Sequence, residues 1–436
     1  MSYFKIGDVF SLVGGGTPST KNSEFWGSGI PWISSSDIDL EGNVSYSKFV
    51  TEKGILSSTT NPVPAGTVVV VTRVGLGKVC IIPVDMCFSQ DMQALIPKKQ
   101  DFSFSKDFLF YQIKYLMSRE KYNGQGTTIS GITKKHLADL VINLPSVDEQ
   151  RRIVSRIEEL FSELDNSVNT LQKTKEQLAV YRQAVLKEAF EGKLTEKWRE
   201  EHPSISISEY WNMICEYKQN TGNTKPYHED ENIELCSLPK EWRWIHVGDI
   251  SSGPEYGTSQ KSAKEGLVPV LRMGNLQNGQ IDWEDLVYTS DPVEIEKYYL
   301  RPNTILFNRT NSAEHVGKTA IYRGQREAIF AGYLIRINQY DCVDPDYLNY
   351  YMNSFVAKSY GKMVKTDGVN QSNINGKKLC SYPLPICTLE EQKELVSIIE
   401  SRLSVCDSIE QTVDIALQQA EAMRQSILKQ AFEGRL

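Results

Sequence analysis

The sequence predicts a duplicated α+β fold, with two globular domains that are each followed by a long coiled-coil helix. Three observations lead to this prediction. The ending AFEGRL (431–436) recurs inside the chain as AFEGKL (189–194). The likeness extends upstream without a gap over 46 positions, Glu149–Leu194 against Glu391–Leu436, and 19 of these are identical. The stretches before the two blocks have their sequence patterns in the same order but share few identical residues. A copied structural unit explains all three observations.

Residues 1–145 and 237–386 are the two predicted globular domains. In the first, an apolar β-rich run after a turn, VPAGTVVVVTR (63–73), ends at Arg73, and DFLFYQIKYL (107–116) has a helical pattern. In the second, LRPNTILFNR (300–309) ends at Arg309, and DYLNYYMNSF (346–355) has a helical pattern. We therefore treat Arg73 and Arg309 as the ends of matching strands. The pairing of strands inside each domain does not follow from these patterns.

Residues 146–194 and 387–436 are the two predicted helices, each about 40 residues long. Apolar residues recur at alternating spacings of three and four, which is typical of a coiled-coil seam. Ser146 with Glu149, and Thr388 with Glu391, have the spacing of capping boxes at the helix starts. Gly192 and Gly434 stand where helices end. The apolar positions are Ile157, Leu160, Leu164, Val168, Leu171, Leu178, Tyr181 and Val185 in the first copy, and Ile399, Leu403, Ile409, Val413, Leu417, Ala420, Met423 and Ile427 in the second.

Residues 195–236 are predicted to be an acidic connector. The chain has a formal net charge of −7, and residues 200–234 contain eight acidic residues and two lysines. Outside this stretch the chain is close to neutral, so basic faces can exist on the domains. The charge balance therefore neither favours nor excludes nucleic acid as a partner.

Several kinds of chemistry lack their sequence patterns. No run reaches the roughly 18–20 apolar residues of a membrane span and no signal layout opens the chain, so we expect a cytoplasmic protein. The eight cysteines form no CxxC pair, so we expect reduced thiols and no metal site. Gly317-Lys318-Thr319 resembles the end of a phosphate-binding loop, but Ser312 replaces its first glycine, which favours a strand-connecting loop. We expect no cofactor and no catalytic residues.

The globular domains carry loops that are rich in side chains suited to DNA. Arginine can bind the edge of guanine with two hydrogen bonds, and asparagine or glutamine can bind adenine in the same way. Lysine and threonine suit phosphates. The alternative is that these are ordinary polar loops. The candidate DNA-binding residues are Thr17, Ser19, Arg73, Lys78, Thr127, Thr128 and Lys134 in the first domain, and Arg272, Asn275, Arg309, Asn311, Lys318, Lys365, Asn370, Gln371 and Asn373 in the second.

The layout resembles the specificity subunit of type I restriction-modification enzymes. The resemblance covers the chain apart from the acidic connector. It rests on GGTPS (15–19), IPW (30–32), the strand that ends at Arg73, the run LPSVDEQ (144–150) into a long helix, and the repeated FEGKL and FEGRL endings. It implies two target-recognition domains, each reading one half of a bipartite DNA site. It also implies that the two helices pack antiparallel as a spacer and relate the domains by pseudo-two-fold symmetry.

The same resemblance implies partners for a chain that is not itself catalytic. These are double-stranded DNA, two methyltransferase (M) subunits, and endonuclease/translocase (R) subunits, with no membrane. We expect the helices to dock the methyltransferases through Arg182, Phe190, Arg424 and Phe432. Two alternatives stay open: a coiled-coil scaffold or adaptor that binds protein partners, and a nucleotide-dependent enzyme built on residues 312–319. Binding to random DNA and to a nucleotide analogue would separate the three.

Overall fold

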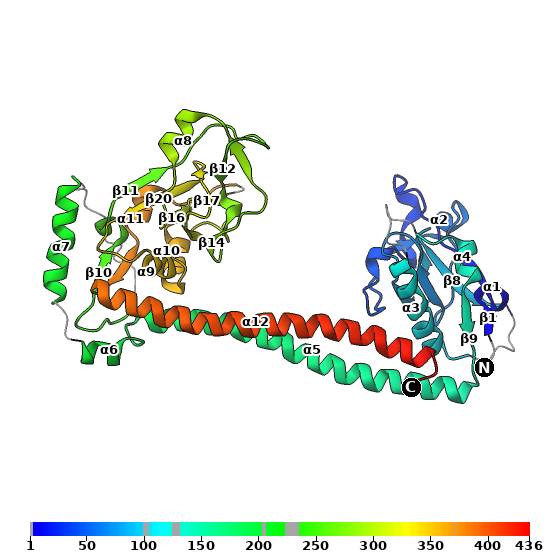
Figure 1. Ribbon diagram of the computed structural model, residues 1–436. Coiled ribbons are helices and arrows are strands. Elements are labelled where there is room, and N and C mark those ends of the chain that lie inside the picture. The colour runs from blue at the N-terminus through cyan, green and yellow to red at the C-terminus, as the bar shows by residue number, and fades with distance from the viewer. Residues whose placement is uncertain (1–2, 99–103, 124–130, 203–205, 223–234, 370) are drawn as a thin grey trace. The chain divides into compact units, whose positions relative to one another are not determined.

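A computed structural model describes the chain except for residues 1–2, 99–103, 124–130, 203–205, 223–234 and 370 (Figure 1). The chain divides into two compact units, one of residues 1–173 with 413–436 and the other of residues 174–412. Each unit holds one globular domain together with a stretch of both long helices. The mixture of helices and strands confirms the predicted α+β class.

The two predicted long helices are present as α5 (Val147–Phe190) and α12 (Leu389–Phe432), each of 44 residues. Each ends at a glycine in the left-handed region, Gly192 and Gly434, both with φ of 73°. The N–H groups of Gly192 and Lys193 donate to carbonyls of the last turn of α5 at 3.0 and 3.1 Å. This bonding pattern closes helix ends that have a left-handed residue, so the predicted C-caps are confirmed.

The predicted capping boxes form only in part. The hydroxyl of Ser146 accepts the N–H of Glu149 at 3.4 Å, but the carboxylate of Glu149 accepts from Arg152 at 2.8 and 3.0 Å. At α12, the hydroxyl of Thr388 has no hydrogen-bond partner within the described part of the chain. The carboxylate of Glu391 instead binds side chains of the connector and of the segment after it. The box prediction is wrong for both carboxylates, because each pairs with an arginine.

In the first unit, α5 and α12 run antiparallel. Arg152, near the start of α5, donates to the carbonyl oxygen of Leu436 at 3.3 Å, and Asp165, three turns later, forms an ion pair with Arg424. The guanidinium of Arg424 also lies over the ring of Phe161, 5.1 Å from its centroid. The apolar seam beside these contacts consists of the buried residues Ile157, Phe161, Ile427, Leu428 and Ala431.

The second unit repeats this pairing with the roles of the helices exchanged. Arg182 of α5 pairs with Asp407 of α12 at 2.7 Å, and Glu188 pairs with Arg402 at 3.6 Å. Asp165 and Asp407 are repeat equivalents, and so are Arg182 and Arg424. One ion pair is therefore made twice, once in each unit.

The heptad pattern overestimates the width of the buried seam. Tyr181, Ile409 and Met423 were assigned to it, but they are 46%, 40% and 54% exposed. A helix pair buries a narrower stripe than a helix on a globular core, so apolar residues at the margin of the pattern face outward. These residues leave apolar surface on the helices.

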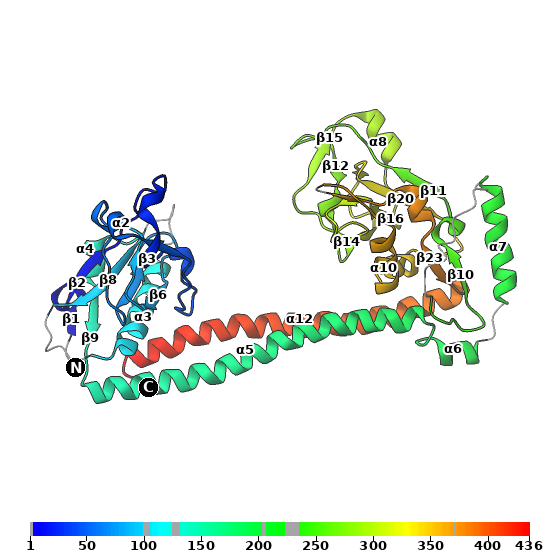
Figure 2. The same cartoon turned by 180° about the vertical axis from the view of Figure 1, so that it is seen from behind.

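The globular domain of the first unit packs helices on two sheets (Figure 2). The four-stranded sheet has the order β2-β8-β5-β6 and is antiparallel, whereas β4-β3-β7 contains the parallel pair β3 and β7. Helix α3 packs against β5 and β6, and β1 pairs with β9. The elements are β1 (Tyr3–Lys5), α1 (Ile6–Val9), β2 (Phe10–Gly14), η1 (Ser23–Phe25), β3 (Trp26–Ile33), η2 (Ser35–Asp37), β4 (Lys48–Val50), α2 (Glu52–Leu56), β5 (Val68–Val71), β6 (Val79–Ile81), β7 (Cys87–Phe88), β8 (Met92–Pro97), α3 (Lys106–Asn123), α4 (Lys134–Asp139) and β9 (Val141–Asn143).

The globular domain of the second unit repeats and extends this arrangement (Figure 1). Its sheets are β11-β20-β16-β18-β14-β13, β15-β12-β19 with the parallel pair β12 and β19, β17-β22-β21, and β10-β23. The elements are β10 (Arg243–His246), η3 (Val247–Ile250), β11 (Ser251–Tyr256), β12 (Val268–Leu271), η4 (Met273–Asn275), β13 (Leu276–Gln277), β14 (Gly279–Ile281), β15 (Val287–Thr289), α8 (Pro292–Tyr298), β16 (Thr304–Asn308), β17 (Thr310–Asn311), β18 (Thr319–Tyr322), β19 (Ile329–Phe330), β20 (Leu334–Gln339), α9 (Pro345–Met352), α10 (Phe355–Val364), β21 (Thr366–Asp367), β22 (Ser372–Asn373), α11 (Gly376–Cys380) and β23 (Pro383–Ile386).

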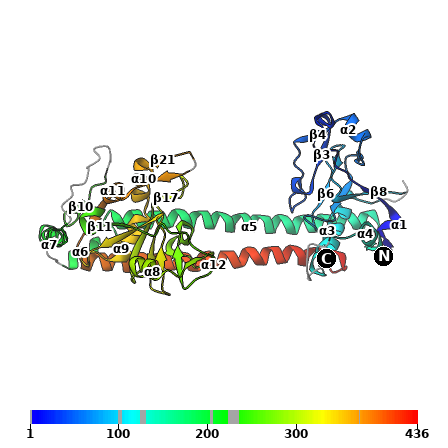
Figure 3. The same cartoon turned by 90° about the horizontal axis from the view of Figure 1, so that it is seen from above.

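The acidic connector contributes two helices to the second unit, α6 (Glu196–Glu201) and α7 (Ile207–Asn220) (Figure 3). Tyr210 and Ile214 of α7 are buried in the main core of this unit. Lys218 pairs with Asp249 at 2.6 Å. This part of the connector is therefore a packed element of the fold, because one face of α7 is apolar although the segment as a whole is acidic.

Each long helix is fastened to its domain by the same glutamine. Gln150 and Gln392 are fully buried and follow the repeated glutamate. The side-chain oxygen of Gln150 accepts the N–H of Ser105 at 2.8 Å, and that of Gln392 accepts the N–H of Asp344 at 2.9 Å. Ser105 and Asp344 stand at the starts of α3 and α9. The glutamines thus join each long helix to the neighbouring domain helix.

Candidate nucleic-acid interface

The glycine-rich loop after β2 lies against the end of β7. The N–H of Gly16 donates to the carbonyl of Phe88 at 2.8 Å, and Gly15 fits because a side chain would meet the backbone of Phe88. Behind the loop, the indole of Trp32 donates to the carbonyl of Gly16 at 2.9 Å. Thr17, at the exposed side, donates its hydroxyl hydrogen to the Gln90 amide oxygen at 2.6 Å. The backbone fixes this loop, while Thr17 and the exposed Ser19 face outward.

A second loop of the first domain carries Arg73 and Lys78. It turns at Gly75 and Gly77, whose φ angles are 88° and 102° and therefore favour glycine. The ammonium of Lys78 donates to the carbonyl of Ser35 at 3.0 Å, which holds it against the neighbouring loop. Arg73 and Lys134 are exposed, and Thr127 and Thr128 lie outside the described residues. Among the described candidates of this domain, Arg73 is thus an exposed side chain that is suited to a base edge.

Arg309 occupies a more ordered setting in the second domain. Its guanidinium lies over the ring of Tyr256, 4.7 Å from the centroid. The hydroxyl of Tyr256 accepts the N–H of Gly376 at 2.9 Å, so the aromatic platform is itself fixed. The Nε of Arg309 has no hydrogen-bond partner among the residues the structure describes. This Nε is buried, so the stacking on Tyr256 is what holds the guanidinium in a fixed orientation.

Strand register shows that Arg73 and Arg309 are not equivalent. Ile132 donates its N–H to the carbonyl of Thr72 at 2.9 Å, and Ile374 donates to the carbonyl of Arg309 at 2.8 Å. The position that matches Arg309 is therefore Thr72, one residue before Arg73. The predicted pairing is wrong by one residue, and side chains one residue apart on a strand point to opposite faces.

Two of the candidates are used inside the second domain. Asn275 is buried, and its amide nitrogen donates to the carbonyls of Asp282 and Glu284 at 3.1 Å each. Its side-chain oxygen accepts the N–H of Arg272 at 2.8 Å. The guanidinium of Arg272 donates to the backbone and the carboxylate of Asp285 at 2.8 and 3.1 Å. A base contact by Asn275 would require breaking bonds that shape this loop.

The remaining candidates of the second domain gather around β17, β18 and β22. Lys318 donates to the amide oxygen of Gln277 at 3.0 Å, and Asn373 donates to the hydroxyl of Thr310 at 2.7 Å. Asn311 accepts the N–H of Ser312 at 2.8 Å, Lys365 pairs with Asp367, and Gln371 is exposed. Asn370 lies outside the described residues. Strand β18 begins at Thr319, which confirms a strand-connecting loop, since a phosphate-binding loop would lead into a helix.

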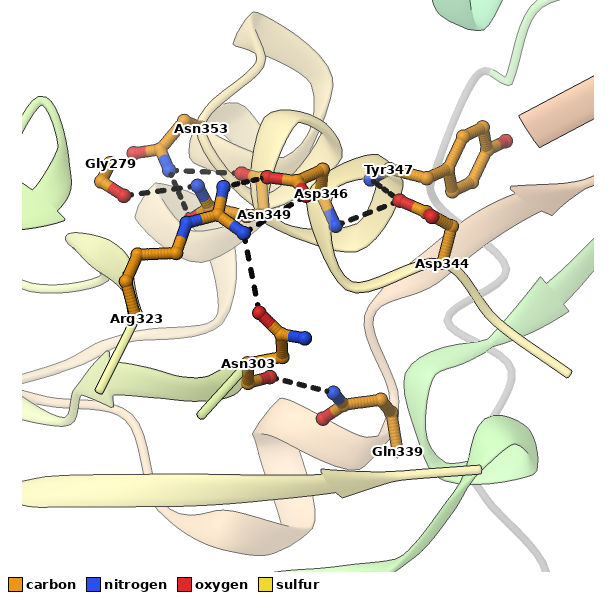
Figure 4. A network of polar contacts seen from close by, with 9 residues as sticks. All are labelled: Gly279, Asn303, Arg323, Gln339, Asp344, Asp346, Tyr347, Asn349 and Asn353. Carbon is orange, nitrogen blue, oxygen red and sulfur yellow. Dashed lines mark hydrogen bonds and ion pairs between the residues drawn. The ribbon is translucent and has the colours of Figure 1, made fainter. Parts of the chain in front are cut away.

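A polar network holds α9 to the sheet behind this surface (Figure 4). Arg323 pairs with Asp346 of α9 and lies 3.4 Å from the amide oxygen of Asn303. Asn349 donates to the carbonyl of Gly279 at 3.0 Å, and Asp344 caps the helix. Asparagine and aspartate side chains thus add polar contacts to the apolar packing of α9, whose Tyr347 and Leu348 are part of the main core. The network joins α9 to the strands of the sheet.

The four candidate docking residues have intramolecular partners. Phe190 is 2% exposed and packs edge-on against Tyr347 and Tyr351, with centroids 5.3 and 5.0 Å away. Phe432, its repeat equivalent, packs on Phe108 and Tyr115. Arg182 and Arg424 form the ion pairs of the helix seam. These side chains anchor the helices, so a role in docking remains a prediction for them.

Sequence patterns missed Tyr256 and the buried contacts of Glu391. Tyr256 precedes Gly257 as Gly14 precedes Gly15, and that alignment with the glycine-rich loop is the pattern that points to it. Glu391 is 1% exposed, and its Oε1 accepts from Thr195, Arg199 and Trp242 at 2.7, 2.5 and 2.8 Å. Its equivalent, Glu149, pairs with Arg152 at the surface. No local pattern separates these two glutamates.

Within the described residues, no group of histidine, cysteine, aspartate and glutamate side chains is placed to hold a metal ion, and no helix is long and apolar enough to cross a membrane. Two domains of one architecture carry different polar side chains at equivalent positions. Together with the shared helix pair, they define the chain as a two-domain recognition protein.

Comparison with known proteins gives the family. A sequence model of the type I restriction modification DNA specificity domain matches residues 1–177 and 239–419. The chain therefore belongs to the type I restriction-modification DNA specificity family, which confirms the resemblance and does not favour a coiled-coil scaffold. Residues 178–238, which include the end of α5 and the connector, and residues 420–436 lie outside the match.

Individual relatives agree with this assignment. The chain is 26% identical over 363 residues to the EcoKI specificity subunit of Escherichia coli K12, covering 81% of this chain and 70% of that one. It is 31% identical over 215 residues to the putative MjaX specificity subunit of Methanocaldococcus jannaschii, covering 47% of this chain and about half (49%) of that one.

Solved structures share the fold across the chain. A chain from work on complex assembly and conformational transition of the type I R-M system matches with a TM-score of 0.69 at 18% identity, covering 100% of this chain and 98% of that one. The HsdS subunit of Thermoanaerobacter tengcongensis matches with a TM-score of 0.50 at 18% identity, covering 100% and 97%.

Proposed function

We propose that this chain is the DNA-reading subunit of a type I restriction-modification complex and binds a bipartite site, with one half-site for each globular domain. The observation that supports this most is the difference between equivalent side chains on a common backbone. Thr72 stands in the first domain where Arg309 stands in the second, with the same backbone hydrogen bonds. Thr72 is buried and donates its hydroxyl hydrogen to the carbonyl of Asp91 at 3.1 Å. One scaffold thus presents a stacked arginine in the second domain and none at the equivalent position of the first, and this difference fits two different half-sites.

The chain directs chemistry that other subunits perform. Its relatives are named specificity subunits, and its sequence lacks a methyl-donor motif. We propose two methyltransferase subunits and the endonuclease/translocase subunits as its partners, in the cytoplasm. Outward-facing apolar residues on α5 and α12 support docking along the helices, because exposed apolar side chains mark interaction surfaces. They are Val180, Tyr181, Val405, Ile409, Ile415 and Met423.

The candidate DNA contacts differ in their expected roles. Arg73 and Arg309 suit guanine, and Gln371 and Asn373 suit adenine. Thr17, Ser19, Lys78, Lys134 and Lys318 suit phosphates. Arg272 and Asn275 are the weakest candidates, since the fold uses their polar groups. Each of these assignments is part of the proposal.

Sequencing of methylated adenines tests the function. The chain is expressed with its methyltransferase subunit in a host that lacks other methylation. We expect one motif of two short specified halves separated by an unspecified gap. The single chain, purified without the methyltransferase, should show no methyl transfer. A continuous motif, or methylation by the chain alone, would contradict the proposal.

A further inference from the structure

Three lysines of the second domain converge from two segments of the chain. Lys318 ends the loop before β18, and Lys358 and Lys362 lie one turn apart on α10. Residues four apart on a helix share a face. Lys318 is held in place by its hydrogen bond to the amide oxygen of Gln277 at 3.0 Å. No sequence pattern singled out Lys358 or Lys362.

The two segments that carry the lysines pack against the same two buried side chains, Tyr382 and Ile374, which form a common seat. A Cβ at Gly361 of α10 would lie 2.5 Å from the hydroxyl oxygen of Tyr382 and 3.6 Å from Cδ1 of Ile374. A Cβ at Gly317 would lie 3.8 Å from each of the same two atoms. Tyr382 and Ile374 are 1% and 0% exposed. Both lysine-bearing backbones therefore approach one rigid pair of side chains.

A further bond ties the segments together. The amide nitrogen of Asn353, which ends α9 just before α10, donates to the carbonyl of Thr319 at 3.0 Å. Thr319 follows Lys318 directly. The backbone positions of the three lysines relative to one another are thus set by the fold.

The cluster has no compensating anion in the described chain. Desolvation lowers the pKa of Lys358 first, and the charges of Lys318 and Lys362 lower it further. No carboxylate among the described residues acts on Lys358 or forms an ion pair with these three. Nearby Lys365, by contrast, pairs with Asp367. Like charges held together cost free energy, which a bound anion would recover.

The cluster is linked to the candidate base reader Arg309. The N–H of Ile374 donates to the carbonyl of Arg309 at 2.8 Å, and the side chain of Ile374 is part of the seat under the lysines. An anion held by the lysines would therefore have a fixed relation to the backbone of Arg309. This coupling is what a contact that sets the register of DNA needs.

We propose that Lys318, Lys358 and Lys362 bind a single phosphate of the DNA backbone and so position one half-site against Arg309. The inference rests on the proposed DNA-reading function. Ammonium groups act as point charges without the fork geometry of arginine, which suits a phosphate better than a base edge. The cluster contributes affinity and register, and it carries no base preference.

Salt-dependent DNA binding by the full chain tests this. Fluorescence anisotropy is measured with one duplex that carries the target and one with scrambled half-sites, over a series of salt concentrations. Lys358→Gln with Lys362→Gln should lower affinity roughly tenfold for both duplexes. It should reduce the slope of log K against log salt by about 0.9, the loss of one phosphate contact. Lys358→Arg should keep the slope. Lys393→Gln, an exposed lysine of α12, is the matched control.

Each outcome either supports the phosphate site or overturns it. A double variant with the wild-type slope overturns the phosphate site and leaves the DNA-reading function intact. A loss confined to one base of the target would make the lysines base readers and also overturns it. Failure of the wild-type chain to bind either duplex overturns the function and the inference together. Lys358→Gln should also raise the melting temperature slightly, since it relieves repulsion, and a clear fall would argue against an uncompensated cluster.

Discussion

Asn308 of β16 offers a test of stability for which the internal repeat supplies a matched residue in the first domain. Its side chain is fully buried, and neither its Oδ1 nor its Nδ2 has a hydrogen-bond partner among the described residues. Its backbone is bonded: the N–H donates to Lys318 and the carbonyl accepts from Gly317, both at 2.8 Å. The equivalent residue of the first domain is Val71, which is also fully buried and donates to Lys78 at 2.9 Å. Asn308→Val therefore installs the residue that the same scaffold already accepts.

The expected effect is stabilisation of the second unit. A buried amide without partners costs roughly 1–3 kcal/mol relative to an apolar group of similar shape. Asn308→Val should raise the free energy of unfolding by about that amount. For a unit of this size, each kcal/mol corresponds to roughly 2–4 °C in melting temperature. The reciprocal change, Val71→Asn, should destabilise the first unit by a similar amount, because it buries the same amide.

Native-state hydrogen exchange measures the two units separately. Amides of β16 and β20 report the second unit, and amides of β5 and β8 report the first. Asn308→Val should slow exchange only in the former, and Val71→Asn should speed it only in the latter. A fall in stability on Asn308→Val would refute the reasoning, since it would mean that the amide is satisfied, for instance by an ordered water.

Three further predictions concern reading, packing and assembly. Arg309→Ala should weaken target binding by about 1–3 kcal/mol and relax one base, as selection from random duplexes would show, whereas a uniform loss would mean a phosphate contact. Glu391→Gln should destabilise the second unit by up to about 3–5 kcal/mol in thermal unfolding, because buried Arg199 loses its closer counter-charge and keeps only Glu241, 3.6 Å from its Nε. The matched surface change Glu149→Gln should stay within about 0.5 kcal/mol, and equal effects would contradict this account. Residues 1–194 alone should form an antiparallel dimer that selects a palindrome, and a monomer in sedimentation would argue against it.

The predictions from sequence are most accurate where the two repeats have identical residues. The helices, their glycine ends and their apolar spacing follow from local patterns that recur at one fixed offset. Between the domains the offset drifts because loops differ in length, so Arg73 was matched with Arg309 although Thr72 is the true equivalent. The backbone hydrogen bonds of Ile132 and Ile374 reveal the shift, and the strand registers at Val71 and Asn308 agree with it.

Burial from distant segments explains the other misses. The capping box at Glu391 has the correct spacing, but Thr195 and Trp242, far away in the sequence, bind its carboxylate. The connector was judged by its acidic composition, whereas Tyr210 and Ile214 decide that α7 packs. Composition averages over a segment, and a few apolar residues at helical spacing are enough to bury one face of it.

The division of the chain also has a consequence for its synthesis. The first unit takes residues 413–436 as well as residues 1–173. Ile157 and Phe161 are covered there by Ile427 and Leu428, which a ribosome adds roughly 270 residues later. At about 5–20 residues per second, these apolar residues of α5 stay uncovered for roughly 13–54 s. During that interval the apolar face of α5 is exposed on the nascent chain. Chaperones, a second nascent copy or a methyltransferase subunit would each be able to bind it.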